Sequence, residues 1–427
     1  MTAINNDILN DLKWRGLIAQ TTDEAALRES LKKPTTLYIG FDPTAPSIHV
    51  GNLVVLLVLR RFQLAGHNPI PLVGGATGLV GDPSGKNEER SLNTTEIVEQ
   101  WVARIRKQLE KFLDFDTAAN PAVMANNLDW TAPLSAIDFL RDIGKHFSVN
   151  QMLAKDAVSS RLNKDGISYT EFSYQVLQAM DFLELYKRYN CTLQLGGSDQ
   201  WGNITAGLDL IRRVEGGSGH AMTIPPLTKA DGTKFGKTAG GAVWLDPEMT
   251  SPYAFFQYWL NSDDADVINF TKVFSFKTRQ EIESLAVRHA ENPGAREAHR
   301  ELARELTSLV HSPEIAQRVE VAARALFGQA DLSELDEATL ASAIAELPRA
   351  TISATEEMPT WVDLLAATGV VDSKSAARRI VKESGAYLNN EKVPSEDFRL
   401  EKSHFLCGKY ALLRKGKRDL AAVELIS

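Results

Sequence analysis

Apolar and polar positions follow two different periods in the first half of the chain. Runs rich in β-branched and aromatic residues at 35–41 and 68–77 predict strands, and the strongly apolar run 52–66 between them predicts a helix. A strand–helix–strand unit of this kind is typical of a parallel sheet. Two later runs, 191–197 and 221–227, predict further strands, so the pattern indicates an α/β fold.

Helical periodicity marks the segments that follow. Residues 93–113 predict an amphipathic helix, which begins with Asn93 and Glu96 at capping-box spacing. Its apolar stripe comprises Ile97, Trp101, Ile105, Leu109 and Phe112. The stretch from Pro252 to Phe327 is almost wholly helical in pattern, which predicts an α-helical domain.

Charge divides the rest of the chain. Residues 328–359 hold seven acidic residues and one basic residue, Arg349, which predicts a weakly helical stretch and a linker. From Thr360 onward 12 Lys or Arg stand against 9 Asp or Glu, whereas residues 1–359 hold 35 against 46. A basic terminal segment on an acidic chain indicates a nucleic-acid-binding appendage. The predicted domains are 1–229, 230–327 and 360–427, with 328–359 as the acidic linker.

The composition is that of a soluble globular protein. Of the 427 residues, 44% are hydrophobic and 24% charged, and the longest apolar runs, such as 53–59, are far too short to cross a membrane. The first residues lack a basic start followed by an apolar stretch, so we expect no signal peptide. Cys191 and Cys407 stand far apart and predict buried, inert thiols without a disulfide or metal cluster. These features predict a cytoplasmic protein with no protein-bound metal.

The stretch His49-Val50-Gly51-Asn52 carries the first candidate chemistry. It follows a strand and a Pro-rich turn, and it opens the apolar helix. A helix N-terminus presents N–H groups that attract phosphate, and a glycine in the first turn allows close approach of a ligand. His49 and Asn52 add two side-chain donors on one face. The alternative is a capped helix with incidental polar residues.

Two glycine-rich loops add cations. Residues 74–90 carry Lys86 and Arg90, but only three residues separate Gly81 from Gly85-Lys86, where a P-loop needs four, so this loop is not a P-loop. A later loop carries Lys234 and Lys237 at a spacing of three. Two ammonium groups on such a loop suit a leaving polyphosphate, because they can neutralise charge as it develops. Considered alone, either loop is an ordinary solvated surface loop.

A predicted buried helix at 172–190 carries three polar side chains on one face. Tyr174, Gln178 and Asp181 fall within an arc of roughly 60°, while most other positions are apolar. A buried carboxylate and amide need hydrogen-bonding partners, which are either groups of the protein itself or a small polar ligand. We favour a small polar ligand as the hydrogen-bonding partner of these side chains. Further polar residues are predicted at the carboxyl edge of the sheet, where open α/β sheets bind ligands, namely Gln194, Asp199, Gln200 and Asn203.

Together these segments resemble the bacterial type of tyrosyl-tRNA synthetase, a class I aminoacyl-tRNA synthetase, over nearly the whole chain. PTAPSIHVGN is similar to the class I HIGH signature, and KFGKT is similar to the KMSKS signature. YIGFDPTAPS, residues 74–86, EFSYQVLQAMD and GGSDQWGNITAG resemble stretches particular to the tyrosine enzymes. Asn52 in place of the second histidine and Phe-Gly in place of Met-Ser depart from the signatures, and both variants fall within the resemblance.

The resemblance implies a Rossmann-like catalytic domain, an α-helical anticodon-binding domain, and a small α+β RNA-binding module like that of ribosomal protein S-four. The implied tyrosine pocket consists of Tyr38, Asp82, Tyr174, Gln178, Asp181 and Gln200. In it Asp181 and the Tyr38 hydroxyl bond the substrate phenol. The substrate ammonium is held by Tyr174, Gln178 and Asp82. The residues implied around the ATP phosphates are Thr44, His49, Asn52, Lys86, Arg90, Lys234, Lys237 and Thr238, and those implied at the ribose are Gly51 and Asp199.

The implied activity is the ligation of L-tyrosine to its tRNA. Tyrosine and ATP form tyrosyl-adenylate and pyrophosphate, with magnesium expected beside the ATP, and tyrosine then passes to the terminal adenosine. The resemblance also implies a homodimer, and an RNA-binding cluster of Lys374, Arg378, Arg379 and Lys382. Two alternatives remain. A tryptophanyl-tRNA synthetase shares the fold and both signatures, although Tyr38 and Asp181 favour a phenol over an indole. A non-catalytic RNA-binding protein on a synthetase scaffold is disfavoured by the retained phosphate-contacting positions.

Overall fold

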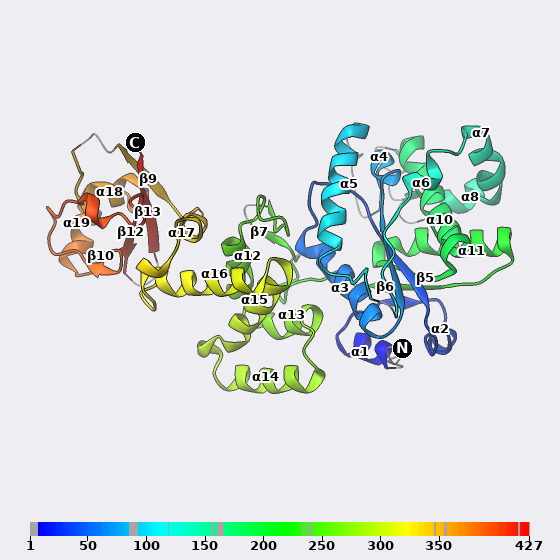
Figure 1. Cartoon of the computed structure of the whole chain (residues 1–427), viewed down its shortest axis with the longest axis horizontal. Helices are drawn as coiled ribbons and strands as arrows, with labels where there is room; N and C mark the ends of the chain where they lie inside the picture. Colours follow the sequence, from blue (N-terminus) through cyan, green and yellow to red (C-terminus); the bar gives the residue numbers. More distant parts are fainter. Residues whose placement is uncertain are drawn as a thin grey trace. The chain divides into compact units, whose positions relative to one another are not determined.

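The strand–helix–strand unit predicted near the N-terminus forms the centre of a six-stranded sheet in the computed structural model of this chain (Figure 1). Strand β2 (Thr36–Phe41) pairs in parallel with β3 (Asn68–Val73), and helix α3 (Val50–Leu64) connects them. On its other side β2 pairs in parallel with β5 (Cys191–Gly197), which pairs in parallel with β6 (His220–Ile224). The prediction of a Rossmann-like α/β fold on a parallel sheet is confirmed.

The chain forms two compact units. The first consists of Met1–Asp246 and Asp264–Arg288, and the second of Pro247–Asp263 and His289–Ser427. Within the described residues every helix is too short or too polar to span a lipid bilayer. The residues that the structure describes are 7–84, 93–117, 119–155, 158–159, 166–233, 235–238, 241–345, 347–353, 357–416 and 419–426.

Two short strands complete the sheet of the first unit. β1 (Gln20–Thr21) pairs antiparallel with β6, and β4 (Ala125–Asn126) pairs in parallel with β3. The strand order is β1-β6-β5-β2-β3-β4, so β2 and β5 lie side by side in the middle. Other helices of this unit include α1 (Ile8–Trp14), α2 (Glu24–Ser30), α4 (Thr77–Val80), α6 (Leu128–Thr131), α7 (Ala136–Asp138), α8 (Val149–Leu153), α13 (Val267–Phe274) and most of α14 (Arg279–Glu291).

Helix α10 (Tyr169–Tyr189) supplies the main apolar support of the sheet. It packs on α11 (Trp201–Glu215) and on β5. The hydroxyl of Ser168 caps its first turn, and Asn190 ends it in the left-handed conformation with φ 51°. The helix contributes buried Val176, Ala179, Met180, Phe182, Leu183 and Leu185 to the cluster that contains Tyr38. The prediction of a buried helix here is confirmed.

Helix α5 (Thr95–Leu109) differs from the prediction in its cap and in part of its buried face, although the predicted Ile105, Leu109 and Phe112 are buried. The cap is Thr94, whose hydroxyl accepts a hydrogen bond from the Ile97 amide, and not Asn93. The Ile97 side chain is 37% exposed. The buried residues are Val98, Val102, Ile105, Gln108 and Leu109. Gln108 lies on this buried face, where its Oε1 accepts a hydrogen bond from the Ile48 amide at 2.8 Å. This bond connects the helix to the segment before α3 and fixes which side of the helix faces inward.

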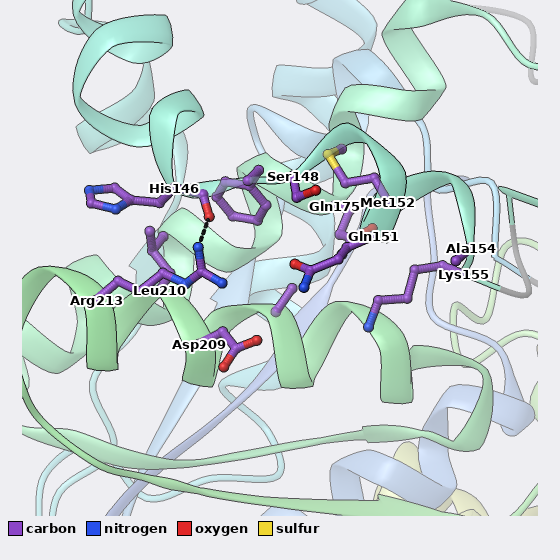
Figure 2. A pocket seen from close by; sticks show the side chains of 12 residues that line it. His146, Ser148, Gln151, Met152, Ala154, Lys155, Gln175, Asp209, Leu210 and Arg213 are labelled. Carbon is purple, nitrogen blue, oxygen red and sulfur yellow. Dashed lines mark hydrogen bonds between the residues drawn. The ribbon is translucent and has the colours of Figure 1, made fainter.

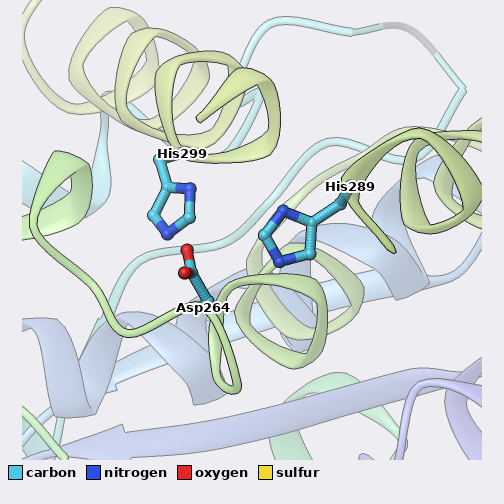
Figure 3. Close-up of side chains that lie close together, drawn as sticks. All are labelled: Asp264, His289 and His299. Atoms are coloured by element: carbon cyan, nitrogen blue, oxygen red, sulfur yellow. The ribbon is translucent and has the colours of Figure 1, made fainter. Parts of the chain in front are cut away.

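Helices dominate the first part of the second unit, so the helical prediction from Pro252 to Phe327 is confirmed. Helix α12 (Pro252–Leu260) packs against α15 (Glu297–Val310), α16 (Pro313–Leu326) and α17 (Glu337–Ile344). Two buried imidazoles, His289 and His299, pack with their ring centroids 5.5 Å apart (Figure 3).

The chain ends in a five-stranded sheet with the order β11-β10-β12-β13-β9. Strand β9 (Arg349–Ser353) pairs in parallel with β13 (Asp419–Ile426), although its residues fall in the segment predicted as a linker. The other strands are β10 (Ala386–Leu388), β11 (Glu391–Lys392) and β12 (Tyr410–Lys415), and helices α18 (Trp361–Ala367) and α19 (Lys374–Lys382) accompany them. The terminal sheet therefore begins before Thr360.

The two cysteines differ in their surroundings. Cys191 is buried in β5, and burial raises the pKa of its thiol. Cys407 is exposed, so the prediction of a buried thiol is wrong for this residue. The reason is local. Cys407 adopts a left-handed backbone conformation, with φ 51°, in the turn before β12, and turns run over the surface.

Candidate active site

Two polar side chains, Tyr38 and Asp181, lie buried among apolar residues between the sheet and α10. Tyr38 is 1% exposed, and its hydroxyl has no hydrogen-bond partner among the described residues. Asp181 is 2% exposed, and its Oδ1 accepts from Trp130 Nε1 at 2.8 Å. Its Oδ2 accepts from Asn127 Nδ2 at 3.0 Å. The protein itself therefore holds this carboxylate, while the neighbouring hydroxyl remains unpaired.

Burial governs the protonation of this pair. It raises the pKa of Asp181 to about 7, although the hydrogen bonds from Asn127 and Trp130 act in the opposite direction. Burial, and then the nearby charge of Asp181, raise the pKa of Tyr38 well above its ordinary value. Tyr38 is therefore a neutral hydroxyl at neutral pH. A ligand hydroxyl that donated to Asp181 would stabilise the ionised carboxylate.

Gln194 adds a second unpaired polar atom. Tyr38 in β2 and Gln194 in β5 are partners in the strand register, so their side chains leave the sheet on the same face. Gln194 is 2% exposed, and its Oε1 lacks a hydrogen-bond partner in the described part of the chain. An unsatisfied buried polar group costs about 1–3 kcal/mol. Two such groups on adjacent strands indicate a site built for a polar ligand.

The second group of polar residues centres on Asp42, directly after β2. Tyr174 Oη donates to Asp42 Oδ2 at 2.6 Å, and Thr77 Oγ1 donates to Asp42 Oδ1 at 2.7 Å. Gly74 is required beside it, because a Cβ there would lie 2.1 Å from Asp42 Oδ1. No pattern in the sequence singled out Asp42. Its position immediately after a predicted strand, at the carboxyl edge of the sheet, is the signal that could have found it.

Hydrogen bonds also gather the predicted residues Asp82, Gln178 and Gln200. Gln200 Nε2 donates to Asp82 Oδ2 at 2.6 Å. Asn203 Nδ2 donates to Gln178 Oε1 at 2.9 Å and to Gln200 Oε1 at 3.2 Å. Asn203, which is 8% exposed, therefore links α10 to the start of α11. The structure places every residue of the predicted tyrosine pocket in one of these polar groups.

The N-terminus of α3 corrects one expectation. The sequence predicts N–H groups open to phosphate, but His49 Nδ1 accepts from the Gly51 amide at 3.0 Å and from the Asn52 amide at 3.3 Å. The imidazole therefore caps the helix. In the neutral ring this assigns the proton to Nε2, which becomes the donor of His49. Gly51 permits the cap, because a Cβ there would lie 2.8 Å from His49 Cε1.

The two signature-like segments meet in space. The Val50 amide donates to the Val243 carbonyl at 2.9 Å, and the Val243 amide donates to the Gly236 carbonyl at 3.3 Å. Gly236 has φ +85°, which L side chains rarely adopt, and a Cβ on it would lie 3.5 Å from the Gly51 nitrogen. The loop that contains KFGKT is thus attached to the first turn of α3.

The other residues predicted to contact ATP are exposed, lie in a short strand, or fall outside the described residues. Thr44 and Asn52 are exposed, and Asp199 is exposed on the short helix Ser198–Gln200. Lys237 and Thr238 form strand β7 (Lys237–Thr238), which pairs with β8 (Gly241–Ala242). Lys86, Arg90 and Lys234 lie outside the described residues.

A cavity of about 390 Å³ lies elsewhere in the first unit, beside α8 and α11. Its lining includes Lys155, Gln175 and Arg213, and Figure 2 shows Arg213 donating to the His146 carbonyl, at 2.8 Å. None of the predicted tyrosine or ATP residues lines it. This cavity is therefore separate from the polar groups around Tyr38 and Asp82.

Helix α19 presents the four predicted RNA-binding cations on the surface of the second unit. Three of them are paired with acids, which the sequence analysis did not foresee. Lys374 Nζ lies 2.7 Å from Asp363 Oδ1. Glu396 lies 3.2 Å from Lys382 Nζ and 3.9 Å from Arg378 Nε. These exposed pairs are weak and open to exchange with phosphate.

Comparison with known families covers most of the chain. Residues 29–328 match the family described as tRNA synthetases class I (W and Y). Residues 339–423 match the family described as tyrosine–tRNA ligase SYY-like C-terminal domain.

Curated proteins of similar sequence include two from Streptomyces. The chain is 59% identical over 422 residues to the tyrosine–tRNA ligase of Streptomyces avermitilis, covering 98% of this chain and 99% of that protein. It is 60% identical over 422 residues to the tyrosine–tRNA ligase of Streptomyces coelicolor, again covering 98% of this chain and 99% of that protein.

Solved structures share the fold. A C-terminally truncated mitochondrial tyrosyl-tRNA synthetase of Aspergillus nidulans matches with a TM-score of 0.69 and 30% identity, over 75% of this chain and 94% of that chain. A tryptophanyl-tRNA synthetase of Encephalitozoon cuniculi matches with a TM-score of 0.54 and 13% identity, over 74% of this chain and 93% of that chain. At such low identity the second match concerns the fold alone.

Proposed function

This chain belongs to the bacterial type of tyrosyl-tRNA synthetase within the class I tRNA synthetases, and we propose that the pocket around Tyr38 and Asp181 is where it binds L-tyrosine. The enzyme joins tyrosine to its tRNA, with ATP as a substrate. One observation carries the pocket assignment. The Tyr38 hydroxyl is buried without a partner, close enough to Asp181 for its charge to act on Tyr38. A phenol can accept from Tyr38 and donate to Asp181.

The hydrogen-bonded groups beside the pocket suit the amino acid's other end. Tyr174, Gln178 and Asp82 are proposed to bind the substrate ammonium, as the resemblance implies. Asp42 orients Tyr174 through the 2.6 Å bond from its hydroxyl. Gln200 and Asn203 fix Asp82 and Gln178 in place before the substrate arrives. Such preorganisation lowers the cost of binding.

ATP is proposed to lie at the junction of α3 and the KFGKT loop. A tyrosine carboxylate oxygen attacks the α-phosphorus, the bond to the bridging oxygen breaks, and pyrophosphate leaves. The carboxylate is already ionised, so no general base is required. The reaction is accelerated by the positioning of the two substrates and by fixed hydrogen-bond donors that stabilise the developing charge. The proposed donors and ribose contacts are Thr44, His49, Gly51, Asn52, Lys86, Arg90, Asp199, Lys234, Lys237 and Thr238.

The second step transfers the tyrosyl group to a hydroxyl of the terminal adenosine of tRNA, and AMP leaves. Magnesium is proposed to enter with the ATP phosphates, since Mg²⁺ is usually bound through substrate phosphates. The terminal module is proposed to hold tRNA through the exposed cations of α19, because phosphate neutralisation by Lys and Arg dominates RNA affinity. The cytoplasm is the proposed compartment.

A homodimer is also proposed, as the resemblance implies. Four of the large exposed apolar side chains lie between residues 137 and 169 of the first unit, and we propose that they belong to the dimer interface. They are Ile137, Leu140, Val149 and Tyr169.

The test is ATP–pyrophosphate exchange with each of the standard amino acids in turn. We expect exchange with tyrosine and far weaker exchange with tryptophan or phenylalanine. Stronger exchange with tryptophan would move the assignment to the tryptophan enzymes, which share the fold. No exchange with any amino acid would support a non-catalytic RNA-binding protein.

A further inference from the structure

Helix α13 connects the two signature segments within the first unit. At its N-terminal end the buried Asp266 accepts from the Ala230 amide through Oδ1 at 2.7 Å, where the KFGKT loop begins. On its side face Phe270 and Phe274 pack against Phe235, the second residue of the KFGKT segment, at centroid distances of 5.0 and 5.3 Å. Phe235 is 9% exposed. The loop therefore rests on α13 at two points.

Two buried arginines hold the other end of α13. Arg61 in α3 donates through NH2 to the Ser275 carbonyl at 2.6 Å and to the Val273 carbonyl at 3.2 Å. Arg15 donates through NH1 to the Ser275 carbonyl at 3.0 Å and through NH2 to the Lys277 carbonyl at 2.7 Å. Both are 5% exposed. Their charges favour the C-terminal end of a helix, where the dipole is negative and carbonyls lack partners within the helix.

These contacts form a continuous path from α3 to the loop. Arg61 lies in the same helix that His49 caps and whose first turn carries Asn52. Its guanidinium lies 4.6 Å above the Phe276 ring and fixes the carbonyls that end α13. Helix α13 then positions Phe235, and the next residue, Gly236, is linked through Val243 to the start of α3. These contacts thereby fix the position of the KFGKT loop relative to the N-terminus of α3.

We propose that Arg61 is a positioning residue for tyrosine activation, which acts through α13 and Phe235 to set the KFGKT loop against the N-terminus of α3. This rests on the proposed role of that loop in adenylate formation. Arg61 is proposed to touch no substrate itself. Its loss shifts α13, and a displacement of about 1 Å at the reacting groups can cost about a hundredfold in rate.

The experiment measures single-turnover tyrosyl-adenylate formation and equilibrium tyrosine binding with the full-length enzyme. We expect Arg61→Gln to slow adenylate formation by about tenfold or more, within the range that misplacement produces, while tyrosine affinity stays unchanged. Arg61→Lys keeps one charged donor and should restore part of the rate. Arg60→Gln is the matched control, because Arg60 donates to Gln63 of its own helix at 2.6 Å. It should have little effect on the rate.

A double-mutant cycle separates positioning from general loss of stability. Phe270→Leu removes an aromatic contact to Phe235 without touching Arg61, and it serves as the second variant if Arg61→Gln does not fold. If Arg61 acts through α13, combining the two should slow adenylate formation no further than the worse single change, although their effects on Tm add. Multiplicative losses of rate, or a parallel loss of tyrosine affinity, would overturn the proposal. Failure of the wild-type enzyme to activate tyrosine would instead overturn the proposed function.

Discussion

At the scale of single residues, the unpaired hydroxyl of Tyr38 separates specificity from stability. Tyr38→Phe removes a group that makes no hydrogen bond within the described protein, so we expect the free energy of unfolding to stay equal or rise slightly. The substrate phenol would lose one partner. We expect the preference for tyrosine over phenylalanine in pyrophosphate exchange to fall by about tenfold, the equivalent of a hydrogen bond of about 1.4 kcal/mol.

Asp181→Ala is the informative comparison for that variant. It leaves the Trp130 and Asn127 donors without their acceptor, so it should lower both selectivity and stability. Urea unfolding and pyrophosphate exchange on both variants test the contrast. If Tyr38→Phe left the ratio of tyrosine to phenylalanine exchange unchanged, the assignment of the Tyr38 hydroxyl to the tyrosine pocket would be wrong.

His67 makes stability depend on pH. It is fully buried, its Nδ1 accepts from the Thr35 amide at 3.3 Å, and burial lowers its pKa to about 4. The unfolded chain, with a pKa near 6.5, binds more protons between these values, so this residue's contribution to stability falls as the pH drops from about 6.5 to 4. The loss can reach about 3 kcal/mol, at about 1.4 kcal/mol per pKa unit.

His67→Asn retains an acceptor but cannot gain a proton. We expect a smaller fall in the free energy of urea unfolding between pH 7.5 and pH 5 in the variant than in the wild type. Comparing the two proteins cancels other titrating groups, including Asp181. Parallel pH profiles would contradict the assignment.

The polar residues of the proposed pocket can be selected from the sequence, but their hydrogen-bond partners cannot. Tyr174, Gln178 and Asp181 stand out because three polar positions share one face of an apolar helix. Trp130 and Asp42 lack such a pattern, since they reach α10 from 51 and 132 residues away in sequence. Only the fold brings these groups together. The sequence left a capped helix open as the alternative at His49, because an imidazole at that position can either cap the helix or face a ligand.

At the scale of elements, periodicity found the long helices and the central strands. It failed where one tertiary contact decided the outcome. In α5 the buried face follows Val98 and Val102, because Gln108 turns that side toward Ile48. Strand β9 is five residues long and gains its partner, β13, from the far end of the chain. No local pattern distinguishes such a strand from a linker.

Helix α19 gives a prediction about RNA binding. Glu396 lies within ion-pair distance of both Arg378 and Lys382, so it competes with phosphate for them. Glu396→Gln should strengthen tRNA binding at low salt by a few fold, since exposed pairs are worth about 0–1 kcal/mol. The salt dependence should also steepen. Glu391→Gln, an exposed acid of β11, makes the same charge change as a control. Equal effects of both variants in filter binding would mean that only net charge matters.

At the scale of the whole molecule, the proposed homodimer can be tested through its exposed apolar side chains. Ile137 is 69% exposed and Val149 59% exposed. Replacing both with Asp should shift the sedimenting species from twice the chain mass of 47.0 kDa to once that mass. Leu64→Asp is the control, because Leu64 is 52% exposed at the end of α3. A wild-type chain that sediments as a monomer, or a double variant that stays dimeric, would contradict this assignment.

We expect the boundary between the catalytic part and the proposed tRNA-holding part to lie further along the chain than charge alone suggests. Helix α17 buries Leu340, Ala343 and Ile344, and it packs on α12 and α16. Strand β9 belongs instead to the terminal sheet through β13. A chain that ends at Ala345 therefore keeps α17 packed on α12 and α16, but it lacks the terminal sheet, including its edge strand β9. A chain that ends at Phe327 uncovers α12 and α16, so it should be the less stable of the two.

We expect the chain ending at Ala345 to form tyrosyl-adenylate at nearly the full-length rate, because every residue assigned to tyrosine and ATP lies between Tyr38 and Thr238. It should charge tRNA poorly, since the basic segment that neutralises phosphate is gone, and its tRNA binding should depend less steeply on salt. Pyrophosphate exchange, tRNA charging and tRNA binding at two salt concentrations, for both truncated chains and the full-length enzyme, provide the measurement. Undiminished charging by the chain ending at Ala345 would show that the terminal module does not hold the tRNA.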